Sequence, residues 1–305
     1  MNKYSFLRPF TGMAGLPTQA ESELDEILSQ IDADSLADSF FDCRKEAVAL
    51  SGNTAPAARL GFFPEGFYPE HAFFSPAKKA FDAAHIDRNA GFLTVLIYFS
   101  VRTLGIYRAY GLSESVFAAS LGELGKAARA FYAKHGFYGA EDYVWLNCFL
   151  IPELFTVGSL QMRLCAFPYE RFDTGFGILH QNDPVVQIHV PECANLSQSA
   201  LEQSYRLAYS LFGVPYFFAD SWLLYPPHRE MLPPDSAIRG FMENFSIIET
   251  DETHDYEGLW RIFGKQTDYR KAALPQKTSL QRAYAARVAK GLPIGSAVGI
   301  RYFKF

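Results

Sequence analysis

The chain has 305 residues, of which 49% are hydrophobic and 16% aromatic, enough to bury one large core or two of ordinary size. Its formal net charge of −5 offers no basic field for nucleic acid or an anionic membrane surface, so neither is expected as a partner. The four cysteines are widely spaced, residues 1–17 lack the apolar segment of a signal peptide, and the apolar run Phe92–Val101 is too short to span a bilayer. These features predict a soluble cytoplasmic protein with reduced thiols.

Apolar residues recur at helical spacing through residues 18–135, which predicts a mainly helical N-terminal half. In the first of these segments Leu24, Ile27 and Leu28 share one face, and acidic residues stand in the first turn. The segment Leu60–Pro76 is rich in Pro, Gly and Phe, so we interpret it as an ordered loop packed by its aromatic side chains. Helices are expected over residues 18–31, 33–50, 76–85, 90–110 and 113–135.

The pattern changes near residue 140, after which short β-like segments alternate with turn residues. We therefore expect two domains, a mainly helical one over residues 1–140 and a second with a mixed sheet over residues 141–305. Outside the central segment described next, the second domain is expected to contain strands at Thr156–Phe167, from Phe176, at Phe245–Glu249, Leu259–Phe263 and Ala297–Phe305, with helices at Ser236–Asn244 and after Thr278 or Ser279.

The segment Pro184–Leu224 contains a strand, a helix and a second strand with their boundary residues. Prolines enclose the β-branched run Val185–Val190, and a Pro cannot donate to a strand ladder. A helix is expected over Asn195–Phe212, capped by Asn195, Ser197 or Ser199 and ended by Gly213. The apolar run Tyr216–Leu224 predicts the second strand. Two strands joined by such a helix should be parallel.

The loop PECANLSQ follows the first of these strands and leads into a helix N-terminus, where an anionic ligand could bind unpaired backbone N–H groups. It has neither GxGxxG nor GxxxxGK[ST], so it predicts no dinucleotide fingerprint and no P-loop. An ordinary βαβ crossover without a ligand explains the spacing equally well. The seven histidines show no HxxxH or HExxH spacing, and no metal site is expected.

Five motifs occur in one order from about Trp145 to the end: VGSLQMRL, QIHVPE followed by NLS, DSWLLYP, LPPDSAIRGF and LPQKTSLQRA. Together they resemble acyltransferase-domain proteins that join a helical N-acyltransferase N-terminal domain to a GNAT-like C-terminal domain. The resemblance covers about half the chain. It implies an α/β (α+β) fold with a GNAT-like mixed sheet and a central parallel βαβ unit. It also implies transfer of an acetyl or other acyl group from acetyl-CoA or another acyl-CoA to an amine of a small molecule or peptide.

The resemblance implies that Val186–Pro191 pairs with the amides of pantetheine and that the next loop and helical turn hold the CoA pyrophosphate. GNAT enzymes carry a Gln/Arg-x-x-Gly-x-Gly/Ala loop here, whereas this loop has no glycine. The residues expected to bind the cofactor are Val190, Ala194, Asn195, Leu196, Ser197, Gln198, Trp222 and Arg282.

Acyl transfer to an amine needs a base and donors for the developing oxyanion. His189 is the first candidate for the base, and a hydrogen-bonded structural histidine is an equally good interpretation. Glu192 and Asp220 are alternative bases, although loop or capping carboxylates are commoner. Ser221 could donate to the acyl carbonyl, but its surroundings lack the G-x-S-x-G elbow of serine hydrolases. Cys193 is interpreted as a buried, inert thiol.

Two functions from different classes therefore remain open, with oligomeric state unassigned. The first is an acyl-CoA-dependent N-acyltransferase. The second is a non-catalytic GNAT-like module that binds acyl-CoA or another metabolite, which the absence of a glycine loop and the presence of Phe241 and Phe245 in place of a tyrosine acid would favour. An acyltransferase acting on carrier proteins would need a basic docking surface, which an acidic chain does not predict.

Overall fold

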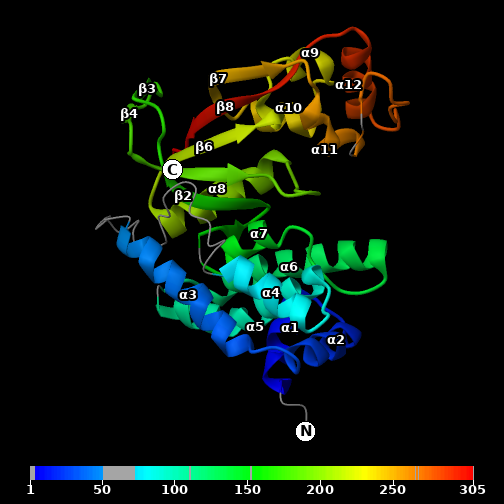
Figure 1. Cartoon of the computed structure of the whole chain (residues 1–305). Helices are drawn as coiled ribbons and strands as arrows, with labels where there is room; N and C mark the ends of the chain where they lie inside the picture. Colours follow the sequence, from blue (N-terminus) through cyan, green and yellow to red (C-terminus); the bar gives the residue numbers. More distant parts are fainter. Residues whose placement is uncertain are drawn as a thin grey trace. The chain divides into compact units, whose positions relative to one another are not determined.

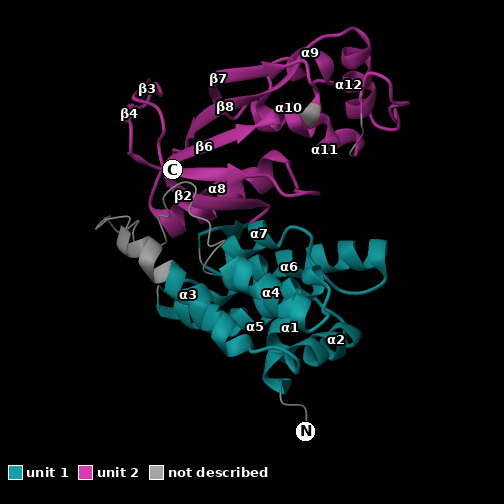
Figure 2. Cartoon of the chain, in the orientation of Figure 1, with its two compact units in different colours: residues 1–157 teal, residues 158–305 magenta. Residues whose placement is uncertain are grey.

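The computed structural model describes residues 4–50, 73–109, 111–151, 153–264, 266 and 268–304. The chain divides into two units, Met1–Val157 and Gly158–Phe305, shown in different colours in Figure 2. The boundary predicted after residue 140 precedes this division. Unit 1 is helical and unit 2 holds a mixed sheet with a parallel pair of strands, so the predicted fold class is confirmed.

Unit 1 consists mainly of helices, as the spacing of its apolar residues predicts (Figure 1). Ser113 caps the longest predicted segment, accepting a hydrogen bond from Val116 N, and Gly136 ends it with φ of 79°. Its helices are α1 (Arg8–Ala14), α2 (Thr18–Leu28), α3 (Ala33–Leu50), α4 (Ser75–Ala83), α5 (Arg88–Ala109), α6 (Glu114–His135) and α7 (Tyr143–Leu146), with 3-10 turns η1 (Ser5–Leu7) and η4 (Asn147–Phe149) and a short strand β1 (Phe155–Val157).

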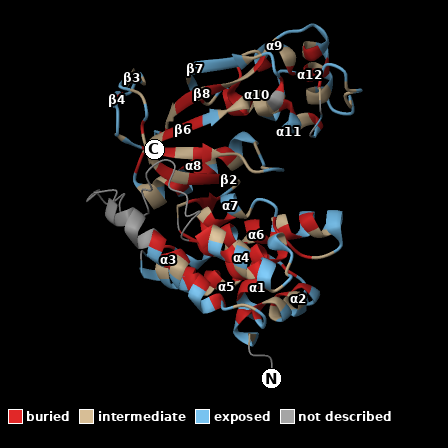
Figure 3. Ribbon diagram, viewed as in Figure 1, coloured by how far each residue is buried: buried red, intermediate tan, exposed pale blue. Residues whose placement is uncertain are grey.

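Helix α5 is the core helix of unit 1. Residues 91–97 are all buried, and Phe92, Val95 and Phe99 are fully so. Figure 3 colours the buried residues of the chain red. In the described part of the chain it is the one helix long and apolar enough to cross a membrane, but 67% of that apolar window is buried inside the protein. The ring of Phe99 stacks on Phe40 of α3 at 4.9 Å between centroids. Residues 60–72 of the predicted aromatic loop lie outside the described residues.

Unit 2 is built on a mixed sheet, whose strands lie side by side in the order β2–β5–β6–β8–β7. β5 and β6 are parallel, while β2 pairs with β5, and β8 with β6 and β7, antiparallel. The short strands β3 and β4 form a separate antiparallel pair. The strands are β2 (Leu160–Ala166), β3 (Arg171–Asp173), β4 (Ile178–His180), β5 (Pro184–His189), β6 (Tyr216–Ser221), β7 (Ser246–Thr253) and β8 (Ile294–Tyr302).

The predicted βαβ unit is confirmed. Helix α8 (Gln198–Phe212) joins the parallel strands β5 and β6, and Ser197 is the N-cap among the three candidates. Gly213 ends α8 with φ of 69°, as predicted. The second strand is shorter than expected, because after Ser221 the chain turns into the 3-10 helix η5 (Trp222–Leu224).

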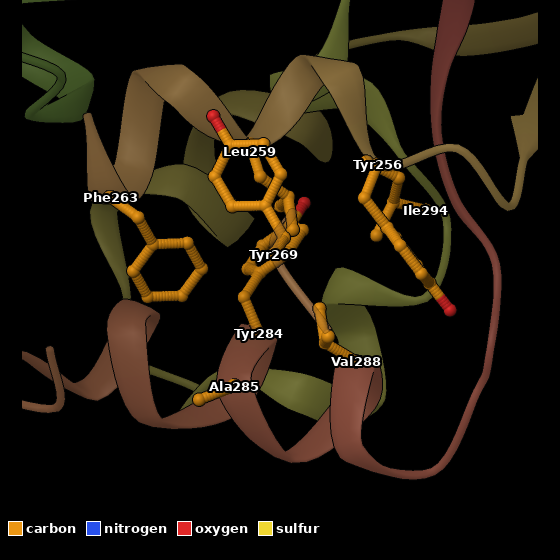
Figure 4. Close-up of a cluster of buried hydrophobic side chains, with 8 residues drawn as sticks. All are labelled: Tyr256, Leu259, Phe263, Tyr269, Tyr284, Ala285, Val288 and Ile294. Carbon is orange, nitrogen blue, oxygen red and sulfur yellow. The ribbon is translucent and has the colours of Figure 1, made fainter. Parts of the chain in front are cut away.

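The strand predicted at Leu259–Phe263 is wrong. This segment forms η6 (Glu257–Leu259) and helix α11 (Trp260–Phe263). Leu259 and Phe263 are four residues apart and enter one buried cluster together with side chains of α12 (Ser279–Ala289), as Figure 4 shows. Their spacing is therefore that of one helical face, which an apolar segment of five residues does not distinguish from a strand. The remaining helices are α9 (His228–Met231) and α10 (Ala237–Met242).

The two faces of the sheet of unit 2 are covered by different elements. On one face α8 packs against β6, where Tyr205 and Phe217 lie 4.9 Å apart between ring centroids. On the other face Val185, Phe218 and Ile300 form a cluster that side chains of the β3–β4 pair partly cover. Since side chains alternate along a strand, the face of Val185 also carries Gln187 and His189.

Candidate functional site

The parallel strands β5 and β6 separate at their carboxyl ends. Their register holds for two residue pairs, of which Gln187 with Phe218 is the last, although β5 continues to His189 and β6 to Ser221. Over that length β5 stays paired with β2, and β6 with β8. The separation is therefore confined to the junction of the two parallel strands. It leaves backbone groups of two strand ends facing a gap in the hydrogen-bond ladder.

The loop between β5 and α8 obtains its turn without glycine. Cys193 adopts a φ of 61°, the left-handed region that glycine usually supplies, and Ala194 N donates to Pro191 O at 3.1 Å. Cys193 is exposed, so the prediction of a buried thiol is wrong. Glu192 is also exposed, whereas Val190 is half-buried at the end of the strand.

The first turn of α8 is fixed by local hydrogen bonds. Asn195 Oδ1 accepts from Ser197 N at 3.0 Å, and Ser197 Oγ accepts from Ala200 N at 3.4 Å. The N–H groups of Gln198 and Ser199 are those that a helix cannot pair internally at its start. Leu196 and Gln198 are also among the residues expected to bind the cofactor. Leu196 is half-buried, and the Gln198 side chain donates a hydrogen bond to Gly240 O of α10. The helix start is thus a donor site beside the separated strands.

His189 is the last residue of β5, and its partner across the antiparallel ladder is Gln161 of β2. Burial, followed by the positive charge of Arg163, lowers the pKa of His189 to about 4. The imidazole is therefore neutral at pH 7 and can accept a proton there. It lies beyond the last pair of β5 with β6, at the end of β5.

The sequence reasoning missed Arg163 and Gln187, which lie on the same face of the sheet as His189. Arg163 Nε donates to Gln187 Oε1 at 2.5 Å between the facing strands β2 and β5. Gln187 is two residues before His189 on β5, so this contact holds the Arg163 guanidinium on the same face of the sheet as the candidate base. No local signal could have identified it, because the two side chains meet only once the register of β2 against β5 is known.

Asp220 lies near the end of β6 on the face that His189 also occupies, and it is exposed. Partial desolvation of its carboxyl, which the surrounding atoms still cover in part, raises the pKa, and the neighbouring charges of Asp251 and Glu249 raise it further. Glu249 in turn accepts a hydrogen bond from Tyr169 Oη at 2.8 Å. Asp220 is thus one of three carboxylates on β6 and β7, the two strands that flank β8, which is a less selective environment for a base than that of His189.

Ser221 and Trp222 follow at the point where β6 becomes η5. Ser221 Oγ accepts from Leu223 N at 3.2 Å and so caps this turn. Trp222 is half-buried and lies edge-on to the imidazole of His228, with 6.0 Å between ring centroids. Arg282 is on α12, where its guanidinium donates to backbone carbonyls of residues 276 and 277. The predicted residues therefore lie at the end of β5, in the segment that leads into α8 and at the end of β6, while the Arg282 side chain binds the segment leading into its own helix.

Within the described ranges no group of three or more His, Cys, Asp or Glu side chains could hold a metal ion. The site consists instead of a neutral imidazole, the donors of a helix start and two separated strands. This arrangement can hold an extended ligand that carries amide groups and an anionic group.

Solved structures with a similar fold are acyltransferases. An acyltransferase variant in complex with octanoyl-CoA is 19% identical, with a TM-score of 0.67 over 97% of this chain and 87% of that one. An acyltransferase in complex with decanoyl-CoA and teicoplanin is 20% identical, with the same TM-score and coverage. A third, in complex with decanoyl-CoA, is 17% identical with a TM-score of 0.60, over 98% of this chain and 99% of that one. At these identities the likeness shows the fold.

Two domain families match the sequence, whereas no curated protein matches it. Residues 5–150 match the N-acyltransferase N-terminal domain. Residues 154–301 match the GNAT-like C-terminal domain, which contains the separated strands and α8. The two matches together run through nearly the whole chain. The chain therefore belongs to the acyltransferase proteins in which an N-acyltransferase N-terminal domain is followed by a GNAT-like C-terminal domain.

Proposed function

We propose that this protein transfers an acyl group from acyl-CoA to the amine of a small molecule. The observation that carries the proposal is the separation of β5 from β6 beside the start of α8. Beyond Gln187 the inner edge of β5 no longer pairs with β6, so its backbone groups are suited to the amides of pantetheine. The N–H groups and the positive dipole end of α8 are suited to the pyrophosphate.

The nature of donor and acceptor is supported by the complexes of the similar structures. Those proteins are bound to octanoyl-CoA or decanoyl-CoA, and one also to teicoplanin. An acyl-CoA donor and a non-protein acceptor of small size follow by analogy for this chain. A carrier protein is a poorer candidate, since a net charge of −5 supplies no basic surface for an acidic partner.

In the proposed reaction the amine nitrogen attacks the carbonyl carbon of the thioester. A C–N bond forms, the C–S bond breaks, and CoA leaves as a thiolate that takes up a proton. His189 accepts the proton that the amine loses and then releases it to solvent, so that charges and protons balance. Because burial and the Arg163 charge lower the pKa of His189 to about 4, the imidazole is in its accepting form throughout the neutral range.

Calorimetric titration with acetyl-CoA, octanoyl-CoA and desulfo-CoA tests the ligand class before any acceptor is known. We expect dissociation constants on the order of micromolar, since the nucleotide, the pantetheine and the acyl chain each add contacts. Failure of all three to bind at millimolar concentration would remove the basis of the proposal. Binding without acylation of any amine would instead identify a non-catalytic acyl-CoA-binding module.

Replacing Asp220 by Asn separates the two candidate bases on this face. We expect kcat to change by less than about threefold. The carboxyl of Asp220 lies near those of Asp251 and Glu249, whereas the imidazole of His189 is neutral at the end of β5. The thermal midpoint should stay constant or rise, since one of three repelling carboxylates is removed. A loss of 100-fold or more in kcat, with the fold intact, would transfer the role of base to Asp220.

A further inference from the structure

The first turn of α8 is tied to α10 by side-chain amides. Gln198 Nε2 donates to Gly240 O at 2.7 Å, and Asn244 Nδ2 donates to Gln198 Oε1 at 3.3 Å and to Gly240 O at 2.5 Å. Gln198 is the first residue of α8, and Asn244 follows the end of α10. We call Gln198, Asn244 and Arg301 the α8 clamp.

Arg301 of β8 extends this contact to the sheet. Its Nη1 donates to Asn244 Oδ1, and its Nη2 lies 3.1 Å from Glu202 Oε2, one turn further along α8. The guanidinium lies over the ring of Tyr205, with 4.5 Å from Cζ to the ring centroid. The Arg301 side chain is only 19% exposed, so these contacts are made in a partly desolvated setting where charged hydrogen bonds hold their geometry.

The clamp connects the elements that follow the two separating strands. α8 follows β5, and α10 follows β6 after η5 and α9. Gln198 and Asn244 therefore link the start of α8 to the segment that follows α10.

We propose that Gln198 and Asn244 are positioning residues for acyl-CoA, which hold the first turn of α8 so that its N–H groups stay directed at the pyrophosphate; this rests on the function proposed above. The β5–α8 loop has no glycine with which to wrap the phosphates, and its Ala194 and Ser197 N–H groups are already used within the loop. Anion binding therefore depends on the first helical turn, and its position decides affinity. Asn244 bonds to Gln198 and acts through it.

The test compares CoA with pantetheine, which lacks the pyrophosphate and the nucleotide, in the full-length protein. Asn244→Ala removes the amide that donates to Gln198 Oε1 and to Gly240 O, so the bond from Gln198 Nε2 to Gly240 O loses the support of its neighbour. We expect the dissociation constant of CoA, measured by calorimetry, to rise about 10-fold, because a displaced donor pair loses alignment with the anion. The dissociation constant of pantetheine, followed by ligand-observed NMR, should change by less than about twofold.

Two further variants control for folding. Asn244→Asp keeps an acceptor for Arg301 but loses both donated bonds, and it should weaken CoA binding as Asn244→Ala does. Ser210→Ala at the opposite end of α8 removes an exposed hydroxyl bonded to Arg206 O and should leave the affinity for CoA unchanged. An equal loss of CoA and pantetheine binding, or unchanged CoA binding in both Asn244 variants, overturns the clamp while the proposed function stands. Absence of CoA binding in the wild type overturns both.

Discussion

Replacing His189 by Gln is expected to lower kcat about 100-fold or more, while the dissociation constant of acyl-CoA stays within about twofold of the wild type. Glutamine retains the size and hydrogen-bonding capacity of the side chain but cannot accept the proton of the amine. Binding of the donor requires no proton transfer, so it should not depend on the imidazole. Steady-state kinetics with a competent amine, together with calorimetric titration of the donor, measures both quantities.

A thermal melt beside these measurements distinguishes a base from a structural histidine. If His189 only ties β5 into the sheet, the substitution should lower the melting temperature and weaken binding and turnover together. If it is the base, the variant should also lose the acidic limb of the kcat profile, which the lowered pKa places near pH 4. Wild-type turnover in the variant would exclude His189 and direct attention to Glu192 or Asp220.

The sequence predicts the central βαβ unit because individual residues mark the boundaries of its elements. Pro184 starts β5, Ser197 caps α8 and Gly213 ends it in the left-handed conformation. The alternation of Val185, Gln187 and His189 with apolar residues also predicts which side chains share a face, and the register confirms it. Such signals act over a few residues, so one sequence suffices to read them.

The parts that the sequence could not predict depend on contacts between distant segments. No residue in β5 or β6 marks the point at which the two strands stop pairing. Arg163 meets Gln187 from 24 residues away, and Asn244 meets Gln198 from 46 residues away. Both contacts follow from strand register and helix packing, which local periodicity does not determine.

A second buried histidine, His228, is expected to make unit 2 sensitive to acid. His228 is fully buried, its Nδ1 lies 3.3 Å from Leu223 O, and its Nε2 lies 2.7 Å from Tyr284 Oη, whose ring enters the cluster of Figure 4. A carbonyl oxygen only accepts, so Nδ1 carries the proton and neutral Nε2 accepts from the tyrosine hydroxyl. Protonation of Nε2 would reverse this hydrogen bond, so that the tyrosine hydroxyl has to accept it, and would place a charge in the core near Arg287.

The free energy of unfolding should therefore fall as the pH decreases from about 6.5 to 4. Burial is the main cause that lowers the pKa of His228 to about 4, against about 6.5 in the unfolded chain, so the unfolded state binds more protons in this window. The stabilisation is complete above pH 6.5, and about 3 kcal/mol is lost on reaching pH 4. His189, with the same direction of shift, adds to the effect.

Urea unfolding of the wild type and of His228→Gln, followed between pH 7.5 and pH 4.5 by tryptophan fluorescence, isolates the contribution of this residue. The variant should be less stable at pH 7.5, because glutamine cannot fill the site between Leu223 O and Tyr284 Oη as the imidazole does. Its stability should nevertheless decline less steeply with acid, since a neutral amide does not titrate, and carboxylates common to both proteins cancel in the difference. Parallel pH curves for the two proteins would show that His228 titrates alike in the folded and unfolded states and would contradict the lowered pKa that its burial implies.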